Sequence, residues 1–136
     1  MDKTALKAFL QDVFPQVSDD FIFDEVSESG VVVRLKTADR HLRPGGTVSG
    51  PSMFALADVA VYAAILARIG PKALAVTTNC SIDFMRKPAA NTDLICHAKL
   101  LKMGRVLAVG DTLLYSDGKP DPVARATLTY SIPPDQ

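Results

Sequence analysis

The chain has 136 residues with 15 basic and 15 acidic side chains, so its formal net charge is zero. A balanced charge excludes the strongly basic proteins that bind nucleic acid or an anionic membrane surface. This length predicts a single domain, residues 1–136, with a full hydrophobic core that still gains stability from oligomerisation.

The first half of the chain predicts a helix, a hairpin and a second, longer helix. Apolar residues at helical spacing predict an amphipathic helix over 3–14 that Pro15 helps to end. Residues 1–14 have acids from the outset and no uninterrupted hydrophobic region, which excludes a signal peptide. We therefore expect a soluble cytoplasmic protein. Strands are expected at 21–26 and 31–37, around a turn at 29–30. A glycine-rich loop, 43–50, then leads to a helix at about 51–69 that Gly70 stops; Pro51 suits its first position and leaves Gly50 as the expected N-cap.

The second half predicts four strands, at 75–84, 93–102, 106–116 and 122–132, separated by short turns. Successive strands with short connections favour an antiparallel sheet, and a helix that is apolar all round must be covered on nearly every side. We therefore expect an α+β fold in which the sheet wraps around the central helix.

Asp58 is the only charge between Met53 and Leu66, an apolar run too short to span a bilayer. An ionised carboxylate inside a buried helix costs several kcal/mol or more unless it is paired or lies at a wet site. One interpretation is a structural acid, satisfied by Tyr62 one turn later or by a symmetry mate at a dimer seam. The other interpretation is a catalytic acid, and the preceding glycine loop favours it.

The spacing of Gly50 and Asp58 predicts that a catalytic site needs two chains. An acyl-transfer site needs an oxyanion donor, for which the Gly50 N–H at the helix N-terminus is suited, and a general base or nucleophile, for which Asp58 is suited. Eight helical residues separate them by about 12 Å, yet both must act within ~3 Å of one reacting group. We therefore expect an obligate homodimer whose helices pair in antiparallel fashion.

The segment Ser49-Gly-Pro-Ser-Met-Phe-Ala-Leu-Ala-Asp58 resembles the hotdog-fold thioesterases of the phenylacetate-type (PaaI-like) acyl-CoA thioesterase family. The family loop has the form N-x-x-G-x-x-H-G-G and is followed by x-x-x-x-L-x-D, and its register is matched by Gly46, Gly50, Leu56 and Asp58. The segment Cys80-Ser-Ile-Asp-Phe-Met-Arg-Lys-Pro88 is similar to the family strand that ends in F-L-R-P.

The resemblance implies a hotdog fold, a homodimer that commonly pairs into a tetramer, and an acyl-CoA substrate without a further cofactor or metal. Three positions depart from the pattern: Arg43 replaces the Asn, Ser49 the His and Pro51 the second Gly. Asn and His help to place substrate and water in the family. We expect Arg43 and Ser49 to do related work.

Other residues are candidates for positioning the substrate. Tyr62 lies on the same helix face as Asp58, and polar groups enter the following strand at Thr77, Thr78 and Asn79. The phosphates of coenzyme A are expected to meet four basic residues at strand ends, which are Arg86, Lys87, Lys102 and Arg105. His41 and His97 are isolated and predicted to be structural or surface residues.

Two function classes remain open at this stage. The first is an acyl-CoA thioesterase acting on a small or medium acyl group. The second is a non-catalytic module that binds acyl-CoA or acyl-carrier protein, in which the three loop changes have removed turnover but kept the ligand tunnel.

Overall fold

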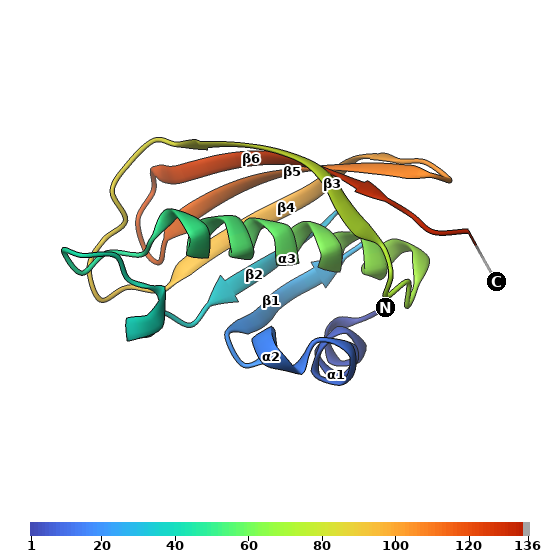
Figure 1. The fold of residues 1–136 in the computed structure, drawn as a ribbon, viewed down its shortest axis with the longest axis horizontal. Helices are drawn as coiled ribbons and strands as arrows, with labels where there is room; N and C mark the ends of the chain where they lie inside the picture. Colours follow the sequence, from blue (N-terminus) through green and yellow to red (C-terminus); the bar gives the residue numbers. More distant parts are fainter. Residues whose placement is uncertain (135–136) are drawn as a thin grey trace.

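The computed structural model describes residues 1–134, and its main element is one six-stranded antiparallel sheet (Figure 1). The elements in chain order are α1 (Lys3–Val13), α2 (Pro15–Ser18), β1 (Phe21–Ser27), β2 (Gly30–Leu35), the 3-10 turn η1 (Asp39–His41), α3 (Gly50–Ile69), β3 (Val76–Phe84), β4 (Leu94–Met103), β5 (Leu107–Ser116) and β6 (Pro122–Ser131). The strand order is β1-β2-β4-β5-β6-β3, so β1 and β3 are the edges. This architecture confirms the predicted α+β hotdog fold.

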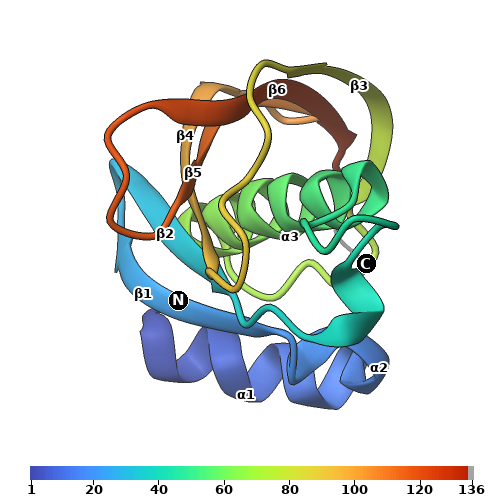
Figure 2. The same ribbon diagram turned by 90° about the vertical axis from the view of Figure 1, so that its left-hand side faces the viewer.

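The central helix α3 lies in the concave face of the sheet, which curves around it (Figure 2). Five of its side chains have no exposed surface: Leu56, Ala57, Ala60, Val61 and Ile65. By length and composition α3 could cross a membrane, but most of it is buried inside the fold. It is therefore the core helix, and no membrane protein is indicated.

Both ends of α3 are capped by the residues that flank it. Ser49 is the N-cap, and its hydroxyl accepts a hydrogen bond of 3.3 Å from the Ser52 N–H. Gly70 ends the helix with a φ of 86°, and its N–H donates to the Leu66 carbonyl at 2.9 Å. The expectation that Gly50 is the N-cap is therefore wrong by one residue, because a serine hydroxyl can accept from the first turn and a glycine cannot.

Two short elements, α2 and η1, were not predicted. Pro15 does more than end α1, because it also begins α2, where a proline loses no hydrogen bond. α1 buries Leu6 and Leu10 and lies beside the β1 edge of the sheet (Figure 2). The strand boundaries agree with the sequence prediction to within one or two residues.

Gly110 in β5 allows α3 to approach the sheet closely. A Cβ at this position would lie 2.7 Å from one methyl carbon of Val61 and 2.9 Å from the other. Both distances are shorter than van der Waals contact, and a valine side chain has little freedom to move away. A residue without a side chain at position 110 therefore sets the depth at which α3 sits in the sheet.

We expect Gly110→Ala to lower the free energy of unfolding by about 1–3 kcal/mol, because the new methyl overpacks the helix–sheet contact. Urea unfolding at a fixed protein concentration measures this loss. Adding Val61→Ala should recover part of it, since the two positions share one space. Gly118→Asn is the matched control: its φ is 79° and nothing lies within 4 Å of a Cβ there, so asparagine should be tolerated. Equal losses at positions 110 and 118 would contradict the close-packing account.

Candidate active site

Asp58 lies at the middle of α3, where the helix faces the start of the edge strand β3 and the end of β6. Its Oδ1 accepts two hydrogen bonds, one from the Thr77 hydroxyl at 2.5 Å and one from the Tyr130 hydroxyl at 2.7 Å. Among residues 1–134, no hydrogen bond to the other oxygen, Oδ2, is found. The carboxylate is thus held through Oδ1, and Oδ2 is left without a hydrogen bond from these residues.

A β-bulge in β3 turns Thr77 toward Asp58. Strict alternation from the inward-facing Cys80 would put Thr78 inward and Thr77 outward. The register with β6 shifts between Thr77 and Asn79, so Thr78 is the extra residue and Thr77 pairs with Tyr130. Bulges are a common means of re-aiming a side chain beside a site. Thr78 and Asn79 are exposed, and the Thr78 hydroxyl donates to the Thr129 carbonyl, so only Thr77 of the three candidates reaches Asp58.

Tyr130 is the site residue that sequence reasoning missed. It is 3% exposed, and its hydroxyl lies 3.0 Å from the Asp58 carbonyl as well as near Oδ1. Burial, followed by the nearby charge of Asp58, raises the pKa of Tyr130 above its ordinary value. Alternation in the last strand predicts that Tyr130 faces inward, but no pattern in the sequence pairs it with an acid 72 residues earlier.

Tyr62 supports Tyr130 and does not bond to Asp58. The two rings are stacked with centroids 6.1 Å apart, and the Tyr62 hydroxyl donates to the Ala73 carbonyl at 2.9 Å. Burial raises the pKa of Tyr62 as well. Tyr62, Tyr130, Phe14, Val59 and Val76 are among the residues that line a cavity of about 200 Å³ beside Asp58. The acid therefore opens onto a small, mostly apolar space.

The glycine loop leads into the N-terminus of α3, where Gly50 lies. Gly50 is the first residue of the helix, where backbone N–H groups have no partner within the helix and the helix dipole is positive. A Cβ on residue 50 would lie 3.3 Å from Cζ of Phe84, so the ring at the end of β3 rests against this glycine. A developing negative charge could be stabilised at this position.

The loop is anchored at its start by a buried histidine. His41 is 6% exposed and its Nε2 lies 3.2 Å from Asp20 Oδ2, while Arg40 pairs with the other carboxylate oxygen of Asp20. Burial alone would raise the pKa of Asp20, but the close contacts with Arg40 and His41 outweigh it and lower the pKa. The His41 carbonyl accepts from the Ser49 N–H at 2.8 Å, which fixes the residue before Gly50.

Gly50 and Asp58 are not brought together within one chain. Gly50 lies at the Phe84 end of β3 and Asp58 at the Thr77 end, so helix and strand run in opposite directions. The Arg43 side chain is exposed on the loop. Ser49 is engaged in capping α3, and its hydroxyl also donates to the Ser52 hydroxyl at 3.2 Å.

The four basic residues predicted to bind phosphate do not form one cluster in a single chain. Arg86 and Lys87 follow the end of β3, and Arg86 lies 3.9 Å from Asp121. Lys102, near the end of β4, and Arg105, in the turn to β5, lie at the end of the sheet where β3 begins, with β6 between β5 and β3. The length of a nine-residue strand, roughly 30 Å, separates the two pairs.

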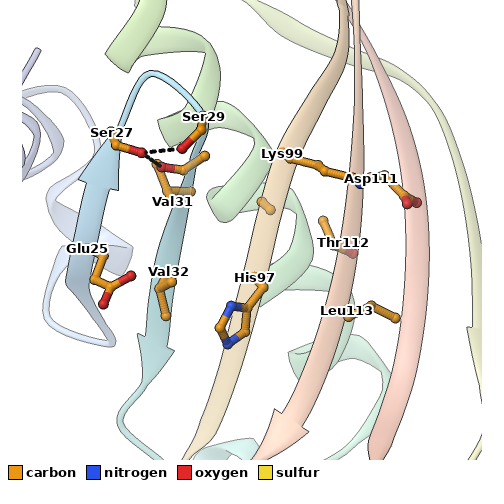
Figure 3. A pocket seen from close by; sticks show the side chains of 12 residues that line it. Glu25, Ser27, Ser29, Val31, Val32, His97, Lys99, Asp111, Thr112 and Leu113 are labelled. Carbon is orange, nitrogen blue, oxygen red and sulfur yellow. Dashed lines mark hydrogen bonds between the residues drawn. The ribbon is translucent and has the colours of Figure 1, made fainter.

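Larger hollows lie elsewhere on the molecule. One of about 580 Å³ lies on the outer face of the sheet, where Glu25, His97, Lys99 and Asp111 project away from α3 (Figure 3). Among the described residues, no carboxylate in this hollow accepts hydrogen bonds from two hydroxyls as Asp58 does, and His97 packs edge-on against Tyr115. No group of three or more metal-ligating side chains occurs among residues 1–134. We therefore take the smaller cavity beside Asp58 as the candidate site, because it holds the hydrogen-bonded carboxylate.

Comparison with known proteins assigns the chain to a family. The model of the thioesterase superfamily matches residues 45–122, a segment that contains Gly50, Asp58 and Thr77. The chain belongs to the thioesterase superfamily. It is accordingly an enzyme of the thioester hydrolase class.

Two solved structures and one relative found by sequence agree with this assignment. A Silicibacter sp. TM1040 protein, provisionally named a thioesterase, is 60% identical with a TM-score of 0.93, over 98% of this thioesterase and 93% of that chain. A mutant of the phenylacetic acid degradation protein PaaI from Thermus thermophilus is 28% identical with a TM-score of 0.75, over 88% of this chain and 99% of that one. A Pseudomonas aeruginosa protein, provisionally named an esterase, is 28% identical over 83% of each chain.

We expect Ser49→Ala in this thioesterase to lower the free energy of unfolding by about 0.5–2 kcal/mol, because the first turn of α3 loses its cap. Thermal and urea unfolding measure the loss. Ser49→Asp is the matched control and should retain most of the stability, since a carboxylate caps equally well. Unchanged stability in Ser49→Ala, with activity alone reduced, would instead assign Ser49 to the substrate.

Proposed function

We propose that this protein hydrolyses a small or medium acyl-CoA thioester, with Asp58 as the general base or nucleophile and the Gly50 N–H as the oxyanion donor. The observation that carries this proposal is the Asp58 carboxylate, whose Oδ1 is held by two hydroxyls and whose Oδ2 is not hydrogen-bonded within residues 1–134. A carboxylate placed in this way has one oxygen ready to take a proton or to attack a carbonyl.

The chemistry can follow two routes that differ in the role of Oδ2. In the first, water attacks the thioester carbonyl carbon while Oδ2 takes a proton from it; the C–S bond then breaks, and the thiolate leaves with that proton. In the second, Oδ2 attacks the carbonyl carbon, the C–S bond breaks and the thiolate leaves, which gives a mixed anhydride. Water then hydrolyses the anhydride, which restores the Asp58 carboxylate, and a proton from that water goes to the thiolate. Both routes yield a carboxylic acid and a free thiol, and both place negative charge on the carbonyl oxygen, where a helix N-terminal N–H stabilises it.

Two exposed features support a homodimer. Within residues 1–134, β3 pairs with β6 alone, and this edge strand carries Val76 and Phe84, which are 57% and 53% exposed. An exposed edge strand offers unpaired backbone N–H and C=O groups to a strand of another chain. On α3, a stripe through Phe54, Asp58 and Tyr62 is left incompletely covered, although residues 56–57 and 59–61 between them are buried. A second copy would cover both features at once.

A two-fold axis at this edge would complete the site. If β3 pairs antiparallel with its copy, the Phe84 end of one strand lies opposite the Thr77 end of the other. Since Phe84 packs on Gly50 and Thr77 bonds to Asp58, this pairing carries the Gly50 of one chain toward the Asp58 of the other. The separation of about 12 Å within a chain is then no obstacle.

The same symmetry would unite the basic residues. Arg86 and Lys87 of one chain would come to the end of the sheet that holds Lys102 and Arg105 of the other. Together they could meet the phosphates of coenzyme A, which enters as part of the substrate, with no further cofactor. Pairing of two such dimers into a tetramer and a cytoplasmic location belong to the same proposal.

We expect wild-type protein to release thiol from acyl-CoAs, and Asp58→Asn to reduce kcat by about 100-fold or more, because an amide can neither take the proton nor attack. A panel of acyl-CoAs with a thiol reagent measures the rates. Asparagine keeps Oδ1 as an acceptor for Thr77 and Tyr130, so the variant should fold. Acyl-CoA binding by calorimetry without thiol release in the wild type would favour the non-catalytic binding alternative.

A mixing experiment tests the two-chain site. Asp58→Asn and Gly50→Val remove opposite halves, so each alone should be inactive, the second because a branched side chain fills the space against Phe84. When equal amounts of the two variants are refolded together, half of the dimers contain one chain of each variant, and one of the two sites in each such dimer is intact. The co-refolded protein should therefore regain about a quarter of the wild-type activity.

The control for this experiment mixes Asp58→Asn with Asp58→Ala, which damages the same half in both chains and should restore nothing. If the mixture of opposite halves also stays inactive while it forms mixed dimers, Asp58 and Gly50 do not share a site across two chains.

A further inference from the structure

We propose that Tyr130 is a positioning residue that fixes Oδ2 as the reacting oxygen of Asp58 and keeps a hydrogen-bond acceptor whether that carboxyl is ionised or protonated. This inference rests on the proposed role of Asp58 in hydrolysis. It adds a residue from the last strand of the sheet, beyond Gly50, Asp58 and the polar residues of β3.

The hydroxyl of Tyr130 has one proton and two acceptors within reach. Asp58 Oδ1 lies at 2.7 Å and the Asp58 backbone carbonyl at 3.0 Å. Thr77 donates to Oδ1 as well, at 2.5 Å. Two donors saturate Oδ1 on the protein side, so an incoming proton or an electrophilic carbon is directed to Oδ2.

The second acceptor matters when Asp58 changes its charge. While the carboxylate is ionised, a hydrogen bond from Tyr130 to Oδ1 stabilises it, since bonds to charged groups are the stronger ones. Once Oδ2 has taken a proton, Oδ1 is a weaker acceptor, and the phenol proton can turn to the backbone carbonyl. A buried donor is therefore never left unpaired, which avoids the desolvation cost that such a group would incur.

The neighbours of Tyr130 fix its ring, and those that can titrate do not change charge in the pH range where Asp58 is protonated. Tyr62 stacks on the ring and is itself fixed by its bond to Ala73. The other titratable groups near Asp58 are Tyr62 on α3 and Cys80 on β3, and burial raises the pKa of each. Both stay neutral in the acid range. Phe14, between α1 and α2, also lines the cavity and is apolar.

The test is Tyr130→Phe, which removes the hydroxyl but keeps the ring and its stacking. We expect kcat to fall about tenfold with KM little changed, because Tyr130 acts on Asp58 and not on the substrate. The acid limb of the kcat profile should move to higher pH by about half a unit to one unit, since the ionised carboxylate loses a donor. In an Asp58→Asn background the same change should have no further effect on kcat.

A measurement that needs no substrate tests the role of Tyr130 independently of the proposed hydrolysis. The titration midpoint of the Asp58 carboxyl carbon, followed by ¹³C NMR and assigned with Asp58→Asn, should also move to higher pH in Tyr130→Phe. This holds whether or not an acyl-CoA of the panel is hydrolysed. Tyr115→Phe, a tyrosine of the outer sheet face, is the matched control and should leave both the midpoint and kcat unchanged.

The outcomes are distinct. A shifted midpoint and acid limb support the positioning role. If Tyr130→Phe lowers only the melting temperature and leaves the midpoint and kcat as in the wild type, the hydroxyl is structural and the proposal is overturned. If the wild type hydrolyses nothing, the proposed function fails, and the NMR midpoint still decides the relation between Tyr130 and Asp58.

Discussion

The burial of α3 is the constraint on which the rest of the structure depends. A 20-residue helix that is apolar nearly all round needs cover on every side, and the sheet supplies it by curving around the helix. Gly110 lets the two approach closely, and α1 extends the cover at the β1 edge. The cover ends along the stripe that holds Phe54 and Asp58. The same burial therefore explains both the curvature of the sheet and the place where α3 is left incompletely covered.

Asp58 can lie on this stripe because polar groups reach it from the strands beside it. The bulge in β3 turns Thr77 inward, and the pairing of Thr77 with Tyr130 puts two hydroxyls on the same carboxylate oxygen. Within residues 1–134, these hydrogen bonds offset the desolvation of the acid, and no ion pair lowers its basicity. An acid neutralised by Arg or Lys would be a poorer base, so this arrangement suits chemistry better than stability alone.

Much of this fold could be predicted from the sequence, because hydrophobic periodicity and turn residues mark the long helix and all six strands. Asp58 stood out for the same reason, as a lone charge in an apolar run. Thr77 could only be proposed together with Thr78 and Asn79, since alternation alone favours the wrong threonine and the bulge that corrects it leaves no sequence signal. Tyr130 depends on the register between β3 and β6, which is a property of the assembled sheet.

The central claim is that one thioester meets the Asp58 of one chain and the Gly50 N–H of another. A crystal structure with a non-hydrolysable acyl-CoA analogue, in which a methylene replaces the thioester sulfur, tests it most directly. The account predicts the carbonyl carbon within about 3–3.5 Å of Asp58 Oδ2 or of a water bound to it, and the carbonyl oxygen at the Gly50 N–H of a second chain. An analogue bound within one chain, or in the hollow on the outer face of the sheet, would contradict it.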